Sequence, residues 1–252
     1  MKKITFICMC GLLLGACAAD TTIPDMSAEN LYQKAYKLFE KTDYEGAAKY
    51  FDEVERQHPY SVWAPRSQIM MAYSFYKKNL YEDAVLALDR FIQLHPGNKN
   101  APYAYYLKGL CYFEQISDIA REQQMTQEAK QTFSDLIARY PHSIYVSDAQ
   151  SKLVLIEDQL AGKEMAVGRY YLKQKEYLPA LSRFQIVVQN YSHTNQVNEA
   201  YYRMAACYLS LGLIDETRKI SDKLRKMYPN TKWTRKTEAL VKKYSSEVKA
   251  KR

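Results

Sequence analysis

The chain has 252 residues, of which 47% are hydrophobic and 25% charged, and its formal net charge is +8. Such a length supports one large domain or a repeat array with a substantial core. The positive charge is concentrated in residues 231–252, which hold eight Lys or Arg and two Glu, while residues 17–230 are balanced. A basic surface spread over the whole fold would favour nucleic acid, so this distribution argues against a nucleic-acid partner.

Residues 1–16 have the features of a secretory signal peptide. Lys2 and Lys3 form a positive start, and the apolar run from Ile4 to Leu14 is too short to span a membrane. The run ends in "LGAC", which resembles the bacterial lipoprotein box. That resemblance implies cleavage before Cys17 and its modification with an S-diacylglycerol and an N-acyl group. The alternative is an ordinary signal peptide that is cut near Ala18.

Residues 17–27 then form a short polar tether. More than one acyl chain is needed for stable anchoring, and the lipid expected on Cys17 meets that need. Ala18 follows the cysteine, where lipoproteins that stay in the inner membrane tend to carry aspartate. We therefore expect an anchor in the outer membrane and no other cofactor.

Five related turns divide the remaining chain, and they contain Pro59, Pro96, Pro141, Ser192 and Pro229. Before these turns, small and large residues recur at spacings close to those of the tetratricopeptide repeat, and the first and last intervals between turns are 37 residues, close to the 34 of that repeat. The first unit has Leu31, Ala35, Leu38, Tyr44, Ala47, Phe51 and Val54 at these positions. The pattern predicts an all-α solenoid of about five helix-turn-helix units, because one such hairpin cannot bury its apolar face alone.

The repeats depart from the pattern in three places. Between Tyr112 and Ala129 the third unit needs about eight extra residues, and an extra helical segment, "SIYVSDAQSKLVLIEDQLAG", precedes the fourth. The fifth has Thr217 and Ser221 where Ala and Phe are expected. We accordingly expect repeats 1–3 over residues 28–141, and repeats 4–5 with an extra helix over 142–230. A basic helix or tail, over 231–252, would follow and cap the last repeat.

Solenoids of this kind bind ligands on the concave face, which the first helix of each unit lines. Tyrosine offers a large contact area at low entropic cost, so an aromatic groove suits the capture of an extended peptide. The alternative is that these rings only pack between neighbouring helices. The groove residues that we expect are Tyr32, Tyr36, Phe39, Arg66, Tyr73, Tyr76, Tyr103, Tyr106 and Phe113.

The sequence gives no sign of catalysis. The histidines His58, His95, His142 and His193 follow equivalent turns, so stacking would separate them rather than gather them around a metal. A Gly-rich phosphate loop, a nucleophile elbow and a metal-binding cysteine cluster are all missing from the sequence. We expect Cys111 and Cys207 to be buried small apolar residues rather than a disulfide.

The phrases "YEDAVLALDRFIQLHPGNKNAPYAYYLKGLCYF" and "VGRYYLKQKEYLPALSRFQIVVQNY" resemble the BamD/ComL family of lipoproteins, which belong to the machinery that assembles outer-membrane β-barrels. This resemblance implies a non-enzymatic scaffold facing the periplasm. Its N-terminal repeats would receive the C-terminal segments of unfolded outer-membrane proteins. Its C-terminal repeats would dock on the POTRA-bearing barrel subunit and on accessory lipoproteins, with Arg183 in the docking segment. The alternative is a repeat lipoprotein that assists the assembly of a secretin or pilus pore.

Overall fold

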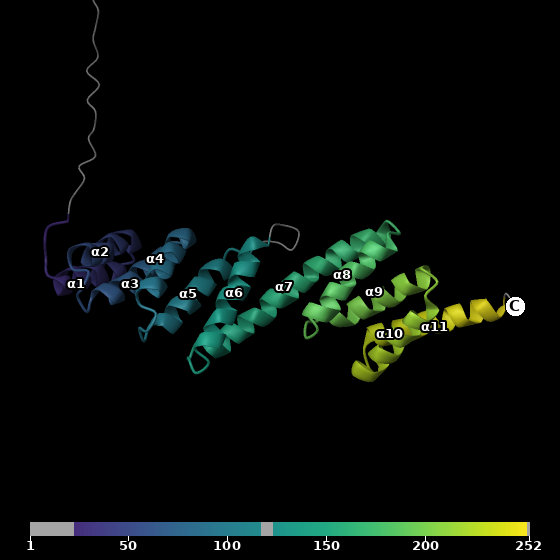
Figure 1. Ribbon diagram of the computed structural model, residues 1–252. Helices are drawn as coiled ribbons and strands as arrows, with labels where there is room; N and C mark the ends of the chain where they lie inside the picture. Colours follow the sequence, from purple (N-terminus) through teal and green to yellow (C-terminus); the bar gives the residue numbers. More distant parts are fainter. Residues whose placement is uncertain (1–22, 117–122, 251–252) are drawn as a thin grey trace, which may run out of the picture.

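The computed structural model describes residues 23–116 and 123–250, with side chains up to Tyr244, and the secondary structure of this part of the chain is entirely helical. Its helices follow one another along a single axis, with α1 and α11 at opposite ends (Figure 1). Their bounds are α1 (Ala28–Glu40), α2 (Tyr44–Gln57), α3 (Ala64–Lys77), α4 (Tyr81–Leu94), α5 (Ala101–Phe113), α6 (Gln124–Arg139), α7 (Val146–Lys173), α8 (Tyr177–Asn190), α9 (Val197–Ser210), α10 (Ile214–Met227) and α11 (Lys232–Ala250).

The helices pair as α1/α2, α3/α4, α5/α6, α7/α8 and α9/α10, and each hairpin packs against the next. The first helix of each hairpin is called helix A and the second helix B. This arrangement confirms the predicted solenoid of tetratricopeptide-like units.

Local sequence signals place the helix ends. The Ser27 hydroxyl accepts a hydrogen bond from the Asn30 amide, and the Asp43 carboxylate accepts one from the Gly46 amide. Four of the turns from helix A to helix B contain one residue with positive φ: Thr42, Asn79, Lys175 or Gly212. Each of these residues lies just beyond the end of its helix A. In four of the five units, a single residue in the left-handed conformation therefore ends helix A where the chain reverses direction.

The core of each hairpin depends on a small residue of helix A facing a large residue of helix B. Ala35, Phe51, Ala72 and Leu88 are fully buried in the first two units. In the third unit, a Cβ atom on Gly109 would lie 2.5 Å from a ring carbon of Phe133. The repeat therefore needs its small residue because the opposing ring fills the space.

The segment expected to form an extra helix is not a separate element. It is the first part of α7, a continuous helix of 28 residues that also supplies helix A of the fourth unit. The segment contains no proline to break the helix. Ile156 and Leu160 pack with α6, whereas Met165 packs with α8 and α9, so α7 joins the two halves of the solenoid.

The other departures are accommodated locally. The extra residues of the third unit lie between α5 and α6, and residues 117–122 fall outside the described part. Thr217 is buried, and its hydroxyl donates to the Leu213 carbonyl at 3.1 Å, so this position of the fifth unit is polar but satisfied.

The predicted C-terminal helix is α11, which packs on α9 and α10. Its Thr234 and Thr237 side chains are buried, and the Trp233 ring lies 5.3 Å from that of Tyr202. Among the described residues, no helix is both long and apolar enough to cross a membrane.

Candidate peptide-binding groove

The expected groove residues lie on α1, α3 and α5, the helix A elements of the first three units. Several of their rings contact one another, within a helix and between α1 and α3. Tyr32 and Tyr36 stack at 6.4 Å, Phe39 lies 5.5 Å from Tyr73, and Tyr73 stacks on Tyr76 at 6.2 Å. Five of the nine expected residues, all on α1 and α3, therefore make ring contacts with one another, and one of these contacts, Phe39 with Tyr73, joins two units.

A hollow of about 220 Å³ lies where α1, α3 and α5 meet. Of the nine expected groove residues, Tyr32, Arg66 and Tyr103 line it. The remaining lining residues are Ile69, Met70, Asn100 and Tyr145. The hollow thus combines aromatic walls, an aliphatic base and two polar side chains.

Arg66 provides the positive charge of the hollow. Its side chain is exposed, and its guanidinium lies 5.5 Å from the centre of the Trp63 ring, as in a cation–π contact. No carboxylate of the described residues forms an ion pair with it. A guanidinium held in this way is free to bind a carboxylate with two parallel hydrogen bonds.

Four tyrosine hydroxyls of the groove, those of Tyr32, Tyr76, Tyr103 and Tyr106, remain protonated at physiological pH because burial raises their pKa values. Burial raises the pKa of Tyr76 to about 12, and burial likewise raises the pKa values of Tyr103 and Tyr106. Burial also raises the pKa of Tyr32, although Arg66 opposes this effect. The hydroxyls of Tyr32, Tyr76 and Tyr103 can therefore donate hydrogen bonds to the carbonyl groups of a bound chain, whereas the Tyr106 hydroxyl already donates to Asp148.

The other expected residues lie outside the hollow and are partly engaged in packing. Phe39, Tyr73 and Tyr76 pack against the core of the first two units, and Tyr36 is 40% exposed. The Tyr106 hydroxyl donates to Asp148 at 2.7 Å. Phe113 packs with α6 and α7, and the Lys152 ammonium lies 4.7 Å from the centre of its ring. Phe39, Tyr73, Tyr76, Tyr106 and Phe113 therefore pack against the hydrophobic cores of the hairpins, as the alternative interpretation expects.

Sequence reasoning missed the residues that precede helix A. Trp63, Asn100 and Tyr145 each lie four positions after the turn proline and directly before α3, α5 and α7. Tyr145 stacks on Tyr106 at 4.9 Å, and the Trp63 ring lies 4.7 Å from that of Tyr32. Their shared offset from the turn was visible in the sequence, but the repeat pattern assigns no function to it.

Arg183, expected to contact a partner, lies on α8. Its guanidinium pairs with Glu164 of α7 at 3.2 Å, and its side chain is 42% exposed. The residue therefore links the two helices of the fourth unit while part of it still faces solvent.

Cys111 and Cys207 are buried free thiols, as predicted. No group of metal-binding side chains occurs in residues 23–116 and 123–244. Two of the histidines bind their own surroundings: the His58 ring contacts the Met26 carbonyl at 2.6 Å, and His193 contacts Glu157. Cys17, the expected lipidation site, lies outside the described residues.

The comparison with known families identifies the chain. Residues 24–224 match the family model of YfiO, an outer-membrane lipoprotein. The chain belongs to this family. It is 40% identical to outer membrane protein assembly factor BamD of Rickettsia prowazekii, over 97% of this chain and 98% of that protein. The BamD proteins of Caulobacter vibrioides and Neisseria meningitidis serogroup A are 40% and 35% identical, over 81% and 87% of this chain and 67% and 90% of theirs.

Proposed function

We propose that this protein is a non-enzymatic scaffold for the folding and insertion of outer-membrane β-barrel proteins. The family is one of outer-membrane lipoproteins, and relatives that match most of the chain are named outer membrane protein assembly factors. A solenoid with an elongated binding face suits such a role, because it can hold several chains at once without chemistry of its own.

The lipid on Cys17 holds the protein on the outer membrane, with the solenoid facing the periplasm. The part of the tether that the structure describes, residues 23–27, is held against α2 by hydrogen bonds. Gln57 accepts a hydrogen bond from the Met26 amide at 3.0 Å and donates one to the Pro24 carbonyl at 3.3 Å. The tether is thus fastened to the end of α2 before α1 begins.

The N-terminal groove receives the C-terminal segments of unfolded outer-membrane proteins. The observation that supports this proposal is the position of Arg66 beside an aromatic hollow. A terminal aromatic side chain fits between Tyr32, Tyr103 and Tyr145, while the terminal carboxylate binds the Arg66 guanidinium. The tyrosines around the hollow then bind the preceding residues of the segment.

The C-terminal half docks on the POTRA-bearing barrel subunit and on accessory assembly lipoproteins. Arg183 is our candidate for a contact in this half. Because its pair with Glu164 leaves part of the side chain exposed, a partner can approach the guanidinium without breaking the hairpin. The continuous helix α7 would connect this docking half rigidly to the substrate groove.

The names of the relatives favour this role over assistance to a secretin or pilus pore. A pull-down from membranes in mild detergent distinguishes the two. Near-stoichiometric recovery of a POTRA-bearing barrel subunit is expected for β-barrel assembly. Recovery of a secretin or pilus component instead would overturn it.

The groove is tested with a short peptide that ends in Phe. We expect the full chain to bind the free-acid peptide more tightly than its C-terminal amide, and Arg66→Gln to remove that difference. Arg218→Gln, on exposed α10, is the matched control and should bind as the wild type does. Equal binding of both peptides by wild-type protein would contradict the assignment of Arg66.

A further inference from the structure

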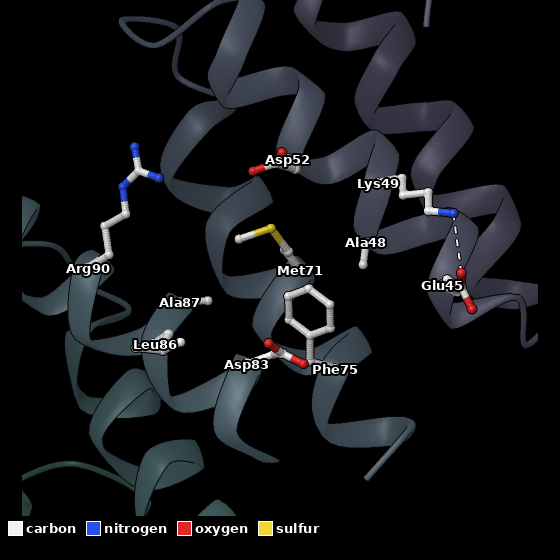
Figure 2. A pocket seen from close by; sticks show the side chains of 10 residues that line it. All are labelled: Glu45, Ala48, Lys49, Asp52, Met71, Phe75, Asp83, Leu86, Ala87 and Arg90. Atoms are coloured by element: carbon white, nitrogen blue, oxygen red, sulfur yellow. Dashed lines mark hydrogen bonds and ion pairs between the residues drawn. The ribbon is translucent and has the colours of Figure 1, made fainter. Parts of the chain in front are cut away.

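The second groove of interest lies on the opposite, helix B side of the first two units. Figure 2 shows it between α2 and α4, with α3 beneath, and its volume is about 480 Å³. Met71 and Phe75 of α3 form an apolar floor between Ala48 and Ala87. The other residues that line it are Glu45, Lys49, Asp52, Asp83, Leu86 and Arg90.

The repeat supplies an internal comparison for this groove. Asp52 of α2 corresponds to Asp89 of α4, because both lie one residue after the large apolar position of helix B, 37 residues apart. Met71 corresponds to Lys108 in the same way. Between the second and third units, the Lys108 ammonium of α5 donates to the Asp89 carboxylate of α4 at 2.5 Å. In the groove between α2 and α4, Met71 occupies the position of that lysine, and Asp52 has no lysine partner among the described residues.

Three of the other charged residues that line the groove are paired, whereas the exposed Asp83 forms no ion pair among the described residues. Glu45 binds Lys78 at 2.7 Å and Lys49 at 3.2 Å, and Arg90 binds Glu55 at 2.8 Å. The second oxygen of Glu55, Oε2, is buried and has no hydrogen-bond partner in the part of the chain that the structure describes. Glu55 does not line the groove, but its carboxylate acts on Asp52, and the carboxylates of Asp52 and Asp83 line the groove without an ion-pair partner among the described residues.

The pKa of Asp52 agrees with the lack of a cation paired with its carboxylate. Partial burial raises the pKa of its carboxyl group, and the Glu55 and Glu53 carboxylates raise it further. The guanidinium groups of Arg90 and Arg56 act in the opposite direction but do not cancel the effect. A cation placed beside Asp52 would relieve this repulsion.

We propose that this groove binds an amphipathic helix of a second protein, which places one Lys or Arg side chain beside Asp52 and apolar side chains on Met71 and Phe75. Two helix B ridges with an apolar floor between them suit the helix-in-groove mode of recognition. Charge complementarity defines the partner's chemistry: its cation takes the place that Lys108 occupies in the next unit. This surface is separate from the peptide-binding groove and does not depend on the function proposed for it.

The chain's own basic segment is poorly placed to fill the groove. The lysine-rich helix α11 lies at the opposite end of the solenoid from α2 and α4 (Figure 1). Residues 17–22, "CAADTT", contain no Lys or Arg. The occupant we assign is therefore a different protein rather than a tail of the same molecule.

The first experiment measures the chemical preference of the groove in the full mature chain. The probe is n-octylammonium, with octanoate as the charge-reversed control, and the reporters are the ¹³C-labelled methyl groups of Ala48 and Ala87. We expect octylammonium to shift both methyl signals and octanoate to leave them unchanged. Asp52→Asn should weaken the octylammonium effect about threefold, the size expected for loss of one exposed charge pair.

Met71→Lys is the decisive variant. We expect the introduced ammonium to pair with Asp52, as Lys108 pairs with Asp89, so that the protein stays folded and octylammonium no longer shifts the reporters. Met71→Leu keeps the apolar floor and should behave as the wild type. Equal shifts from octylammonium and octanoate, or an unchanged response in Asp52→Asn, would overturn the proposal even if Met71→Lys failed to fold.

The second experiment identifies the occupant in cells. A photo-crosslinking residue at Leu86, which is 69% exposed, should capture a partner whose crosslink disappears in Met71→Lys and persists in Met71→Leu. The control position is Gln131 of α6, which follows the buried Ala129 by two residues as Leu86 follows Ala84. A crosslink between two copies of this chain, or one that survives Met71→Lys, would overturn the assignment of the partner.

Discussion

Gly168 of α7 lies so close to Phe184 of α8 that a Cβ atom on the glycine would come within 2.5 Å of the ring carbon Cε1. Gly109 and Phe133 have the same relationship one unit earlier. Both phenylalanines are fully buried. In these two units, the distance between helix A and helix B is therefore set by a ring on one helix and the lack of a side chain on the other.

Gly168→Ala should destabilise the fold. The added methyl group must displace the Phe184 ring from a well-packed core, which costs roughly 1–3 kcal/mol of unfolding free energy. Denaturant unfolding followed by circular dichroism measures this difference. Gly97→Ala is the control, because a Cβ atom there meets nothing within 4 Å, and it should change stability by less than about 0.5 kcal/mol. Equal stability of the two variants would contradict the close approach.

The pair of α6 and α7 should respond to acid through Glu157. Burial by itself raises the pKa of its carboxyl group, but hydrogen bonds from Lys130, at 2.9 Å, and from His193 bring the pKa below its ordinary value. A carboxyl group with a lowered folded-state pKa stabilises the protein above its unfolded-state pKa, and that contribution is lost as the pH falls through the folded-state value.

Glu157→Gln should therefore lower stability at pH 7 and reduce its dependence on pH in the acidic range. Denaturant midpoints from pH 3 to pH 7 test this expectation. Glu216→Gln is a suitable control, since Glu216 pairs with Lys219 on the exposed surface of α10. The same pH slope in Glu157→Gln and the wild type would contradict a role for this carboxylate.

Tyr73→Ala combined with Tyr76→Ala should weaken capture of a peptide that ends in Phe. The substitutions remove two stacked rings from the face shared with Phe39, and an aromatic contact contributes roughly 0.5–1.5 kcal/mol beyond the burial of area. Binding is measured by fluorescence anisotropy well below the melting temperature, because both rings also pack against the core. Unchanged affinity in a folded double variant would limit the binding site to the hollow around Arg66.

Arg183→Ala should affect docking more than folding. Its ion pair with Glu164 is partly exposed, so its removal should cost less than about 1 kcal/mol. Binding to the isolated POTRA domains of the barrel subunit should weaken, as measured by titration calorimetry. Arg225→Ala, which removes an exposed pair within α10, is the control. A large loss of stability with unchanged docking would make Arg183 a structural residue only.

The two buried thiols should react only on unfolding. Burial raises the pKa of Cys111 to about 12 and that of Cys207 to about 11, and the thiolate is the reactive form. In a chain that begins at Ala18, iodoacetamide at pH 8 should label neither cysteine in native protein and both in denaturant, as read by mass spectrometry. Rapid native labelling of either residue would contradict its burial.

The repeat could be predicted from the sequence alone. Small and large residues alternate between Leu31 and Val54, and again in later units. This pattern is local, and its spacing is the one expected for two helices packed against each other. For the same reason, burial of Cys111 and Cys207 and the helix after Trp233 were predictable. Each depends on neighbours that lie within one or two units along the chain.

The meeting of residues from different units could not be predicted in this way. Repeat counting placed Tyr32, Arg66 and Tyr103 on one face, but stacking of the units brought Asn100 and Tyr145 from the turns into the same hollow. The continuity of α7 and the groove beside Asp52 also depend on contacts between units. A periodic sequence specifies the internal packing of each hairpin, whereas the surfaces between hairpins depend on the side chains that differ from one repeat to the next.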